Sequence, residues 1–117
     1  MKRVYVAGAM QADNILTMLE NISVGVKYGA ILLEKGFAPF VPHLDIAFKL
    51  QQGSDYHVPM QNYYGYTMEW LKASECVVVC PNWQNSKGTI AEIETAKELN
   101  IPVYFSLDEF FEKESEI

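Results

Sequence analysis

Apolar and polar residues follow two kinds of pattern along this chain, one typical of strands and the other of helices. Short apolar runs predict four strands at 3–7, 37–41, 76–80 and 101–105. The run at 76–80 is continuously apolar, which is typical of a strand buried on both faces of a parallel sheet. Apolar residues recur at helical spacing over 17–35, 63–73 and 89–99, and Ser106 with Glu109 forms a capping-box pattern that begins a last helix.

Alternating strands and helices predict an α/β fold with a parallel sheet, right-handed crossovers and helices on both faces. A length of 117 residues favours a single domain that spans 1–117. Ligands in such sheets bind outside the carboxyl ends of the strands. Segments 8–10, 42–45 and 82–88 follow three of those ends, so we expect the functional residues there.

The helix predicted at 89–99 carries a carboxylate on its apolar side. Glu92 falls inside the stripe formed by Ile90, Ile93, Ala96 and Leu99. A carboxylate in the first turn of a helix, facing the core beside a loop, is a candidate nucleophile or base. The structural alternative is a capping box, in which Thr89 caps the helix and Glu92 bonds back to its backbone.

The segment before this helix is suited to an anion. Ser86, Gly88 and Thr89 offer hydroxyl and backbone N–H groups where the helix dipole favours a phosphate or carboxylate, although an ordinary helix start has the same composition. Trp83 either stacks on a base or packs within the protein. His43, at the end of the second strand, either contacts a ligand or is structural. Four tyrosines before the third strand form either a lid or a dimer face: Tyr56, Tyr63, Tyr64 and Tyr66.

The charge and composition of the chain limit the partners that it can be expected to bind. The net charge of -6 and only nine Lys and Arg residues argue against binding to a nucleic acid polymer. No hydrophobic signal region or membrane span is expected, and Cys76 and Cys80 lie too far apart along one strand to form a disulfide, so the protein is expected in the cytoplasm. The two histidines show no metal-binding spacing, and we expect neither a metal ion nor a cofactor.

Three segments together resemble one protein family. They are residues 4–9 (VYVAGA), residues 70–75 leading into the third strand, and residues 82–92 (NWQNSKGTIAE), in which Ser86, Gly88 and Glu92 are followed by Ala96. Over most of its length the chain resembles the nucleoside 2-deoxyribosyltransferase superfamily, including its nucleotide N-hydrolase branch and short relatives often encoded by phages. With this resemblance, we expect a flavodoxin-like three-layer sandwich whose sheet has four to five strands in the order 2-1-3-4(-5).

The resemblance implies that Glu92 attacks the anomeric carbon of a deoxyribose and that Ser86 helps to hold a 5′-phosphate. The family usually has an aspartate at the position of Thr67, so this chain lacks a residue that assists the sugar and the leaving base. The expected function is cleavage or base exchange at the N-glycosidic bond of a nucleoside or its 5′-monophosphate. The alternatives are a non-catalytic protein that binds a nucleotide or signal nucleotide, and a purely structural protein.

The predicted partners are a small nucleoside or nucleotide and a second copy of the chain in a homodimer or higher oligomer, in the cytoplasm of a bacterium or a phage-infected cell, with no membrane contact. Glu92 is the predicted catalytic residue. The predicted substrate-binding residues are Gly8, Ala9, Met10, His43, Thr67, Asn82, Trp83, Ser86, Gly88 and Thr89.

Overall fold

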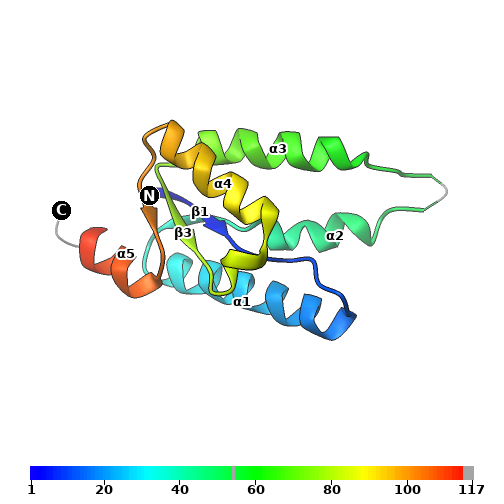
Figure 1. The fold of residues 1–117 in the computed structure, drawn as a ribbon, viewed down its shortest axis with the longest axis horizontal. Helices are drawn as coiled ribbons and strands as arrows, with labels where there is room; N and C mark the ends of the chain where they lie inside the picture. Colours follow the sequence, from blue (N-terminus) through cyan, green and yellow to red (C-terminus); the bar gives the residue numbers. More distant parts are fainter. Residues whose placement is uncertain (54, 115–117) are drawn as a thin grey trace.

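A parallel sheet of four strands lies at the centre of the structure (Figure 1). The computed structural model describes residues 1–53 and 55–114. Its strands are β1 (Arg3–Ala7), β2 (Ala38–Phe40), β3 (Cys76–Val79) and β4 (Val103–Tyr104). Their order is β2-β1-β3-β4, and every neighbouring pair is parallel. This confirms the predicted α/β class and the predicted order of the four strands.

The helices alternate with the strands, as expected, although several begin earlier than the apolar spacing indicates. They are α1 (Ile15–Glu34), α2 (Ile46–Lys49), α3 (Met60–Lys72), α4 (Lys87–Glu98) and α5 (Leu107–Glu114), with short 3-10 turns η1 (Pro42–Asp45) and η2 (Trp83–Asn85). Helix α1 begins at Ile15 because the side chain of Asn14 accepts a hydrogen bond of 2.8 Å from the backbone of Thr17. Helix α3 begins at Met60, directly after Pro59.

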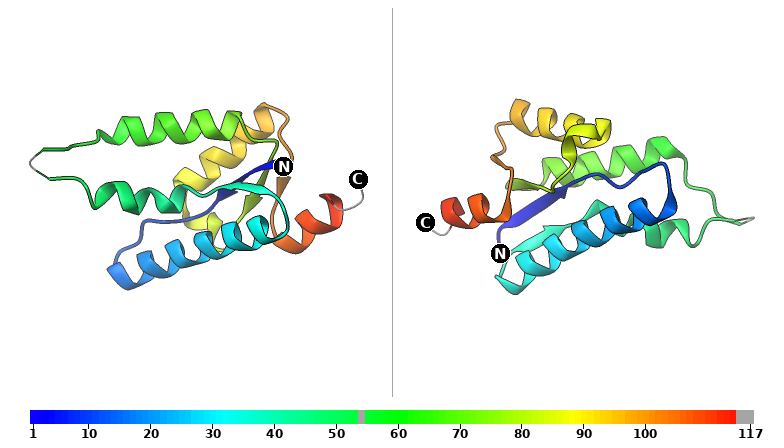
Figure 2. Two further views of the ribbon diagram at one scale, coloured as in Figure 1. Left: turned by 180° about the vertical axis from the view of Figure 1, so that it is seen from behind. Right: turned by 60° about the horizontal axis from the view of Figure 1, so that its bottom comes forward.

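Two apolar cores lie on opposite faces of the sheet, because successive strand residues point to opposite sides. Val4, Val6 and Val78 face one core with α1 and α5, through Leu32 and Phe110. The other core contains Tyr5, Ala7, Val77 and Val79, and it is closed by α3 and α4 through Leu71, Ile93 and Ala96. Figure 2 shows helices on both sides of the strands. The fold is therefore the predicted three-layer sandwich.

Helix α1 has the length and hydropathy of a possible membrane span, which the sequence pattern did not lead us to expect. The same helix packs on the sheet: Leu32 is fully buried in a core, and Gly25 and Gly29 are also buried. Only 17% of the apolar window of α1 is buried, so the helix packs on the sheet by one side and leaves most of its surface uncovered.

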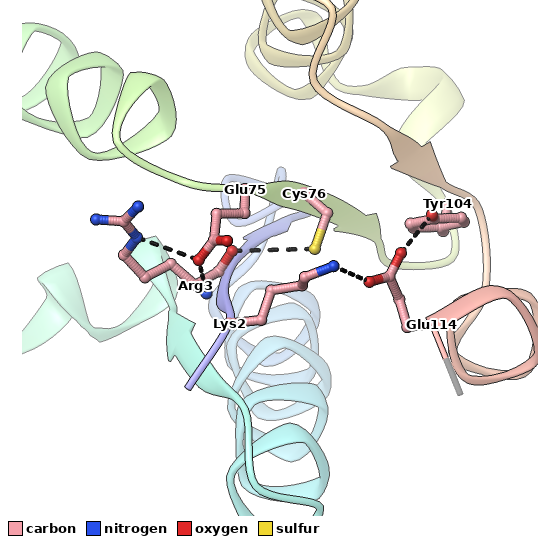
Figure 3. Close-up of polar contacts among 6 residues, drawn as sticks. All are labelled: Lys2, Arg3, Glu75, Cys76, Tyr104 and Glu114. Carbon is pink, nitrogen blue, oxygen red and sulfur yellow. Dashed lines mark hydrogen bonds and ion pairs between the residues drawn. The ribbon is translucent and has the colours of Figure 1, made fainter. Parts of the chain in front are cut away.

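A polar network joins the start of β1 to β3 and α5 (Figure 3). The ammonium of Lys2 bonds to Glu114, which also accepts a hydrogen bond of 2.6 Å from the Tyr104 hydroxyl. On the other side, Glu75 accepts a hydrogen bond of 3.0 Å from the backbone of Arg3. This network fixes α5 against the sheet edge at the end opposite to the carboxyl ends of the strands.

Candidate functional site

A cavity of about 1090 Å³ opens at the carboxyl ends of β1 and β3. It is lined by residues 8–14 after β1, the first turns of α1, part of the segment 42–49 after β2, one side of α3, the loop that follows β3, and the beginning of α4. This is the place where open parallel sheets bind ligands, since the loops that leave neighbouring strands diverge there. Its volume is at the upper end of the usual range for small-molecule sites, about 300 to 1,000 Å³.

Glu92 lies at the floor of this cavity and is held by a residue of the central sheet. Tyr5 points to the same face as α4, and its hydroxyl donates a hydrogen bond to Oε2 of Glu92. Burial raises the pKa of the Glu92 carboxyl to about 7; the hydrogen bond from Tyr5 opposes this shift, and the nearby charge of Asp45 adds to it. A helix N-terminus favours the ionised carboxylate, but burial outweighs that effect at Glu92.

The capping-box alternative for Glu92 is not what the structure has. Ser86, rather than Thr89, caps α4: its side chain accepts a hydrogen bond of 3.2 Å from the backbone N–H of Thr89. Thr89 is only 1% exposed, and its hydroxyl donates a hydrogen bond of 2.8 Å to the same Ser86 oxygen. Glu92 is therefore free of a capping role and faces the cavity with its carboxylate.

Asp45 is a second carboxylate in the cavity, and the sequence analysis did not single it out as a candidate. It ends η1, is 6% exposed, and accepts a hydrogen bond from the Tyr66 hydroxyl of α3 on Oδ1. Burial raises the pKa of Asp45 above its usual range, against the opposing effects of the Tyr66 hydrogen bond and the charge of Lys49. Tyr66 itself is fixed by Phe40 and Phe48, at ring distances of 6.0 and 6.2 Å.

His43 lies beside Asp45 and also lines the cavity. It is 2% exposed, and its ring packs directly on Gly25 of α1. Neither ring nitrogen has a hydrogen-bond partner among the described residues. Burial lowers the pKa of His43, partly opposed by the backbone of Ala9, so the ring is neutral at physiological pH. Buried polar atoms without partners are rare, which makes His43 available to a polar atom of a ligand.

The beginning of α4 faces the same cavity. Ser86, Lys87 and Gly88 line it, together with Asn82, whose backbone is left-handed with φ of 67°. The first N–H groups of a helix have no partner within the helix, and the dipole makes this end attractive to anions. The arrangement can therefore receive a phosphate or carboxylate.

Thr67, which stands where the resemblance led us to look for an aspartate, also lines the cavity. Its hydroxyl contacts two carbonyl oxygens of its own helix, those of Tyr63 at 2.9 Å and Tyr64 at 3.1 Å. A threonine hydroxyl bonded in this way is a weak acid that stays protonated. Thr67 supplies no proton at physiological pH.

The structure brings nearly all the predicted site residues to one cavity. The residues that line it are Gly8, Ala9, Met10, His43, Thr67, Asn82, Ser86, Gly88, Thr89 and Glu92. Trp83 is not among the lining residues; its ring packs on Phe105 at 5.2 Å, which is the packing alternative considered for it. Tyr63 and Tyr64 line the cavity, the Tyr66 hydroxyl bonds to Asp45, and Tyr56 is exposed away from the cavity; whether these tyrosines form a lid or a dimer face stays a prediction. The expected homodimer stays a prediction.

Within residues 1–53 and 55–114, no group of three or more His, Cys, Asp or Glu side chains is arranged to hold a metal ion. Three carboxylates line the cavity: Asp13 is exposed, whereas Asp45 and Glu92 come from different elements and are each held by a tyrosine hydroxyl.

Comparisons with known proteins agree with the fold. A family model described as a domain of unknown function (DUF4406) matches residues 2–105. Among solved structures, the chain is similar to a 2-deoxyribosyltransferase from the psychrotolerant bacterium Bacillus psychrosaccharolyticus, with a TM-score of 0.63 and 17% sequence identity over 86% of this chain and 69% of that one. At this identity the likeness shows a common fold. No curated protein matches the sequence.

Proposed function

This chain belongs to the DUF4406 family, and we propose that it cleaves or exchanges the N-glycosidic bond of a nucleoside or a nucleoside 5′-monophosphate. The observation that carries the proposal is Glu92, a carboxylate at the floor of the cavity whose Oε2 is held by the Tyr5 hydroxyl. The fold that the chain shares with a 2-deoxyribosyltransferase supports the proposal.

In the proposed reaction the ionised Glu92 attacks the anomeric carbon from the side opposite to the base. The C1′–N bond breaks, its electron pair goes to the base, which takes up a proton from water, and an ester links the sugar to Glu92. Water or a second base then attacks the same carbon, loses a proton to the solvent and releases the carboxylate. Dividing one difficult displacement into two easier ones is the usual advantage of covalent catalysis, and the oxocarbenium-like transition states favour a carboxylate beneath the sugar. Tyr5 orients Glu92 through its hydrogen bond.

A second candidate is a protein that binds a nucleotide without changing it. The observation that favours it is Thr67, whose hydroxyl is bonded to the carbonyls of its own helix and supplies no proton to a leaving base. Calorimetric binding with full recovery of unaltered ligand would support this candidate, and turnover would exclude it.

The test of the proposal is incubation of the purified protein with a panel of ribo- and deoxyribonucleosides and their 5′-monophosphates, with chromatography to follow the free base. We expect release of base from at least one member of the panel. A second incubation with an added free base separates exchange from hydrolysis, since a new nucleoside appears only if the base is the acceptor. A panel without any release contradicts the proposed function.

Replacement of Ser86 by alanine is expected to separate nucleotides from nucleosides. A phosphate at the beginning of α4 accepts hydrogen bonds from the Ser86 hydroxyl and from backbone N–H groups, and a hydrogen bond to a charged group contributes about 1.5 to 3 kcal/mol. Ser86→Ala should therefore weaken a monophosphate by roughly tenfold to a hundredfold, while the nucleoside is nearly unaffected. Calorimetry with both ligands measures the difference.

The control for this experiment is Ser106→Ala. Ser106 caps α5, where its hydroxyl accepts a hydrogen bond of 3.0 Å from the backbone of Glu109, and it does not line the cavity. Both variants lose a helix cap, which costs about 1 kcal/mol of stability, but only Ser86→Ala should lose affinity. Equal loss of nucleoside and nucleotide affinity in Ser86→Ala would make Ser86 a structural cap only.

The activity should depend on pH through Glu92. Because its pKa is raised to about 7, the fraction of ionised carboxylate increases as the pH rises through 7, and kcat/KM should increase with it. Asp45→Asn removes a negative charge that contributes to this shift, so the acid limb should move to lower pH. A profile of kcat/KM from pH 4 to 9, recorded for the unchanged protein and for Asp45→Asn, gives the pH of the acid limb in each. An acid limb near 4.5 in the unchanged protein would contradict the assignment.

A further inference from the structure

Two carboxylates with little exposure share the cavity, the buried Asp45 and the partly buried Glu92, and neither forms an ion pair among the described residues. The ion pairs among the described residues involve other acids: Glu114, Glu75 and Glu69. The charge of Lys49 lowers the pKa of Asp45, but the Lys49 ammonium lies over the ring of Tyr63 at 5.8 Å and forms no ion pair with Asp45. Buried carboxylates are normally matched by a positive group. The tyrosine hydroxyls satisfy one oxygen of Asp45 and one of Glu92 but bring no positive charge.

Two lysines line the cavity, but neither forms an ion pair with Asp45 or Glu92 among the described residues: the ammonium of Lys49 lies over the ring of Tyr63, and Lys87 is exposed at the beginning of α4. The other side chains considered as proton donors to a departing base are poorly suited to that role. The Thr67 hydroxyl is bonded to carbonyl oxygens of α3, and the ring of His43 is neutral because burial lowers its pKa. The charge of Asp45 raises the pKa of Glu92, so Asp45 is the carboxylate that ionises first. A neutral nucleobase leaves as an anion unless it is protonated, and general-acid help of that kind contributes about 10²- to 10⁴-fold in rate.

We propose that the preferred substrate has a cationic leaving group: a heteroaromatic base attached to the sugar through a positively charged ring nitrogen, placed between Asp45 and Glu92. Pyridinium bases and N7-alkylated purines are two chemical forms of this class. The inference rests on the proposed function and specifies its substrate. The buried His43, whose two ring nitrogens have no partner among the described residues, lines the same cavity and offers a neutral donor or acceptor to the base or the sugar.

The reaction with such a substrate balances without a proton donor. An oxygen of the Glu92 carboxylate forms a bond to C1′, the C1′–N bond breaks, and its electron pair goes to the ring nitrogen, which becomes neutral. In the second step, water attacks C1′, its oxygen forms the new hydroxyl group, and Glu92 leaves as a carboxylate. The proton lost by the water is taken up by Asp45 and passes to the solvent.

A cationic substrate also prepares the nucleophile. The positive ring stabilises the charged forms of Asp45 and Glu92, so Glu92 ionises more readily in the complex than in the free protein. A neutral base has no such effect and leaves Glu92 with the raised pKa of about 7. The cavity therefore selects its substrate by charge before any bond is broken.

The test measures binding in a protein that cannot form the ester, so that its result does not depend on turnover. In the Glu92→Gln variant, calorimetry compares guanosine 5′-monophosphate with its N7-methyl derivative, which differ by one methyl group and one positive charge. We expect the cationic nucleotide to bind roughly tenfold to a hundredfold more tightly, the effect of one charge-assisted contact of about 1.5 to 3 kcal/mol. Nicotinamide mononucleotide is the pyridinium arm of the same experiment.

The double variant Asp45→Asn with Glu92→Gln is the control for contacts of the methyl group. In it the preference for the cationic nucleotides should disappear, whereas Tyr66→Phe with Glu92→Gln keeps the carboxylate and should keep the preference. Equal binding of neutral and cationic nucleotides, or a preference that survives loss of Asp45, would overturn the inference.

Turnover in the unchanged protein separates this inference from the proposed function. Release of base from the cationic nucleotides, abolished by Glu92→Gln and corrected for spontaneous hydrolysis, supports both. Glu92-dependent release from neutral nucleotides alone, lost in Asp45→Asn, would mean that Asp45 donates a proton; the proposed function would then stand and the cationic preference would fall. Absence of release from every substrate would contradict the proposed function itself.

Discussion

Glu92→Gln is expected to lower the release of base by about a thousandfold or more, because an amide has the shape of the carboxylate but does not attack carbon. The replacement keeps an oxygen that accepts the hydrogen bond of Tyr5, so the cavity should stay intact. Chromatographic rates with the best substrate of the panel measure the loss. Ligand affinity, measured separately, should change far less than the rate.

The control is Glu94→Gln on the same helix, since Glu94 is exposed and does not line the cavity. Glu94→Gln changes the charge of α4 by the same amount as Glu92→Gln and should leave the rate of base release within a factor of about two. A rapid acid quench followed by mass measurement should show the sugar attached to the unchanged protein and not to Glu92→Gln. A Glu92→Gln protein with normal turnover would show that the reaction takes place without this carboxylate.

Gly25→Ala is expected to destabilise the fold strongly. A Cβ atom at Gly25 would lie 2.3 Å from Cγ and Nδ1 of the His43 ring, which is far below van der Waals contact. The His43 ring is 2% exposed, and its Nε2 is also only 3.1 Å from a Cβ atom built at Gly8 after β1, so the ring has little room to give way. Overpacking of this kind costs about 1 to 3 kcal/mol. Because His43 lines the cavity, ligand affinity should fall with stability.

The matched control is Gly65→Ala in α3, where the new Cβ meets no atom within 4 Å. Alanine in an exposed helix position is more favourable than glycine by about 0.5 to 1 kcal/mol, so this variant should be stabilised. With about 4 °C per kcal/mol for a domain of this size, the melting temperatures of the two variants should differ by about 6 to 16 °C. Thermal unfolding followed by circular dichroism measures both. Equal melting temperatures would contradict the close contact between α1 and His43.

The sheet was the most predictable part of this molecule, because buried parallel strands are apolar on both faces. The continuous run at 76–80 corresponds to β3 (Cys76–Val79), which has neighbours on both sides. Helix starts were less predictable, because they depend on single side chains. Asn14 caps the N-terminus of α1, and Ser86 rather than Thr89 caps that of α4. The segment 42–49 has no clear period, and its turn η1 and helix α2 were not expected.

Only part of the candidate site was visible in the sequence. Glu92 was conspicuous as a charge within an apolar stripe, whereas Tyr5 within a strand of apolar residues looks like an ordinary core residue. Its hydroxyl meets Glu92 only because α4 crosses the same face of the sheet, which is a contact between residues 87 positions apart. Asp45 has the position of a site residue, after the second strand, but its burial depends on α3 and Tyr66.

The place of β1 between β2 and β3 has a consequence for folding during synthesis. As the chain leaves the ribosome, β2 follows β1 closely and can cover one edge, whereas β3 is made about 70 residues after β1. Until β3 is made, the backbone N–H and C=O groups along one edge of the apolar strand β1 stay unpaired, and another nascent chain can pair with them. Parallel pairs that close such long loops also form slowly. The segment that holds Tyr5 is therefore the one we expect a chaperone to protect until β3 and α4 emerge.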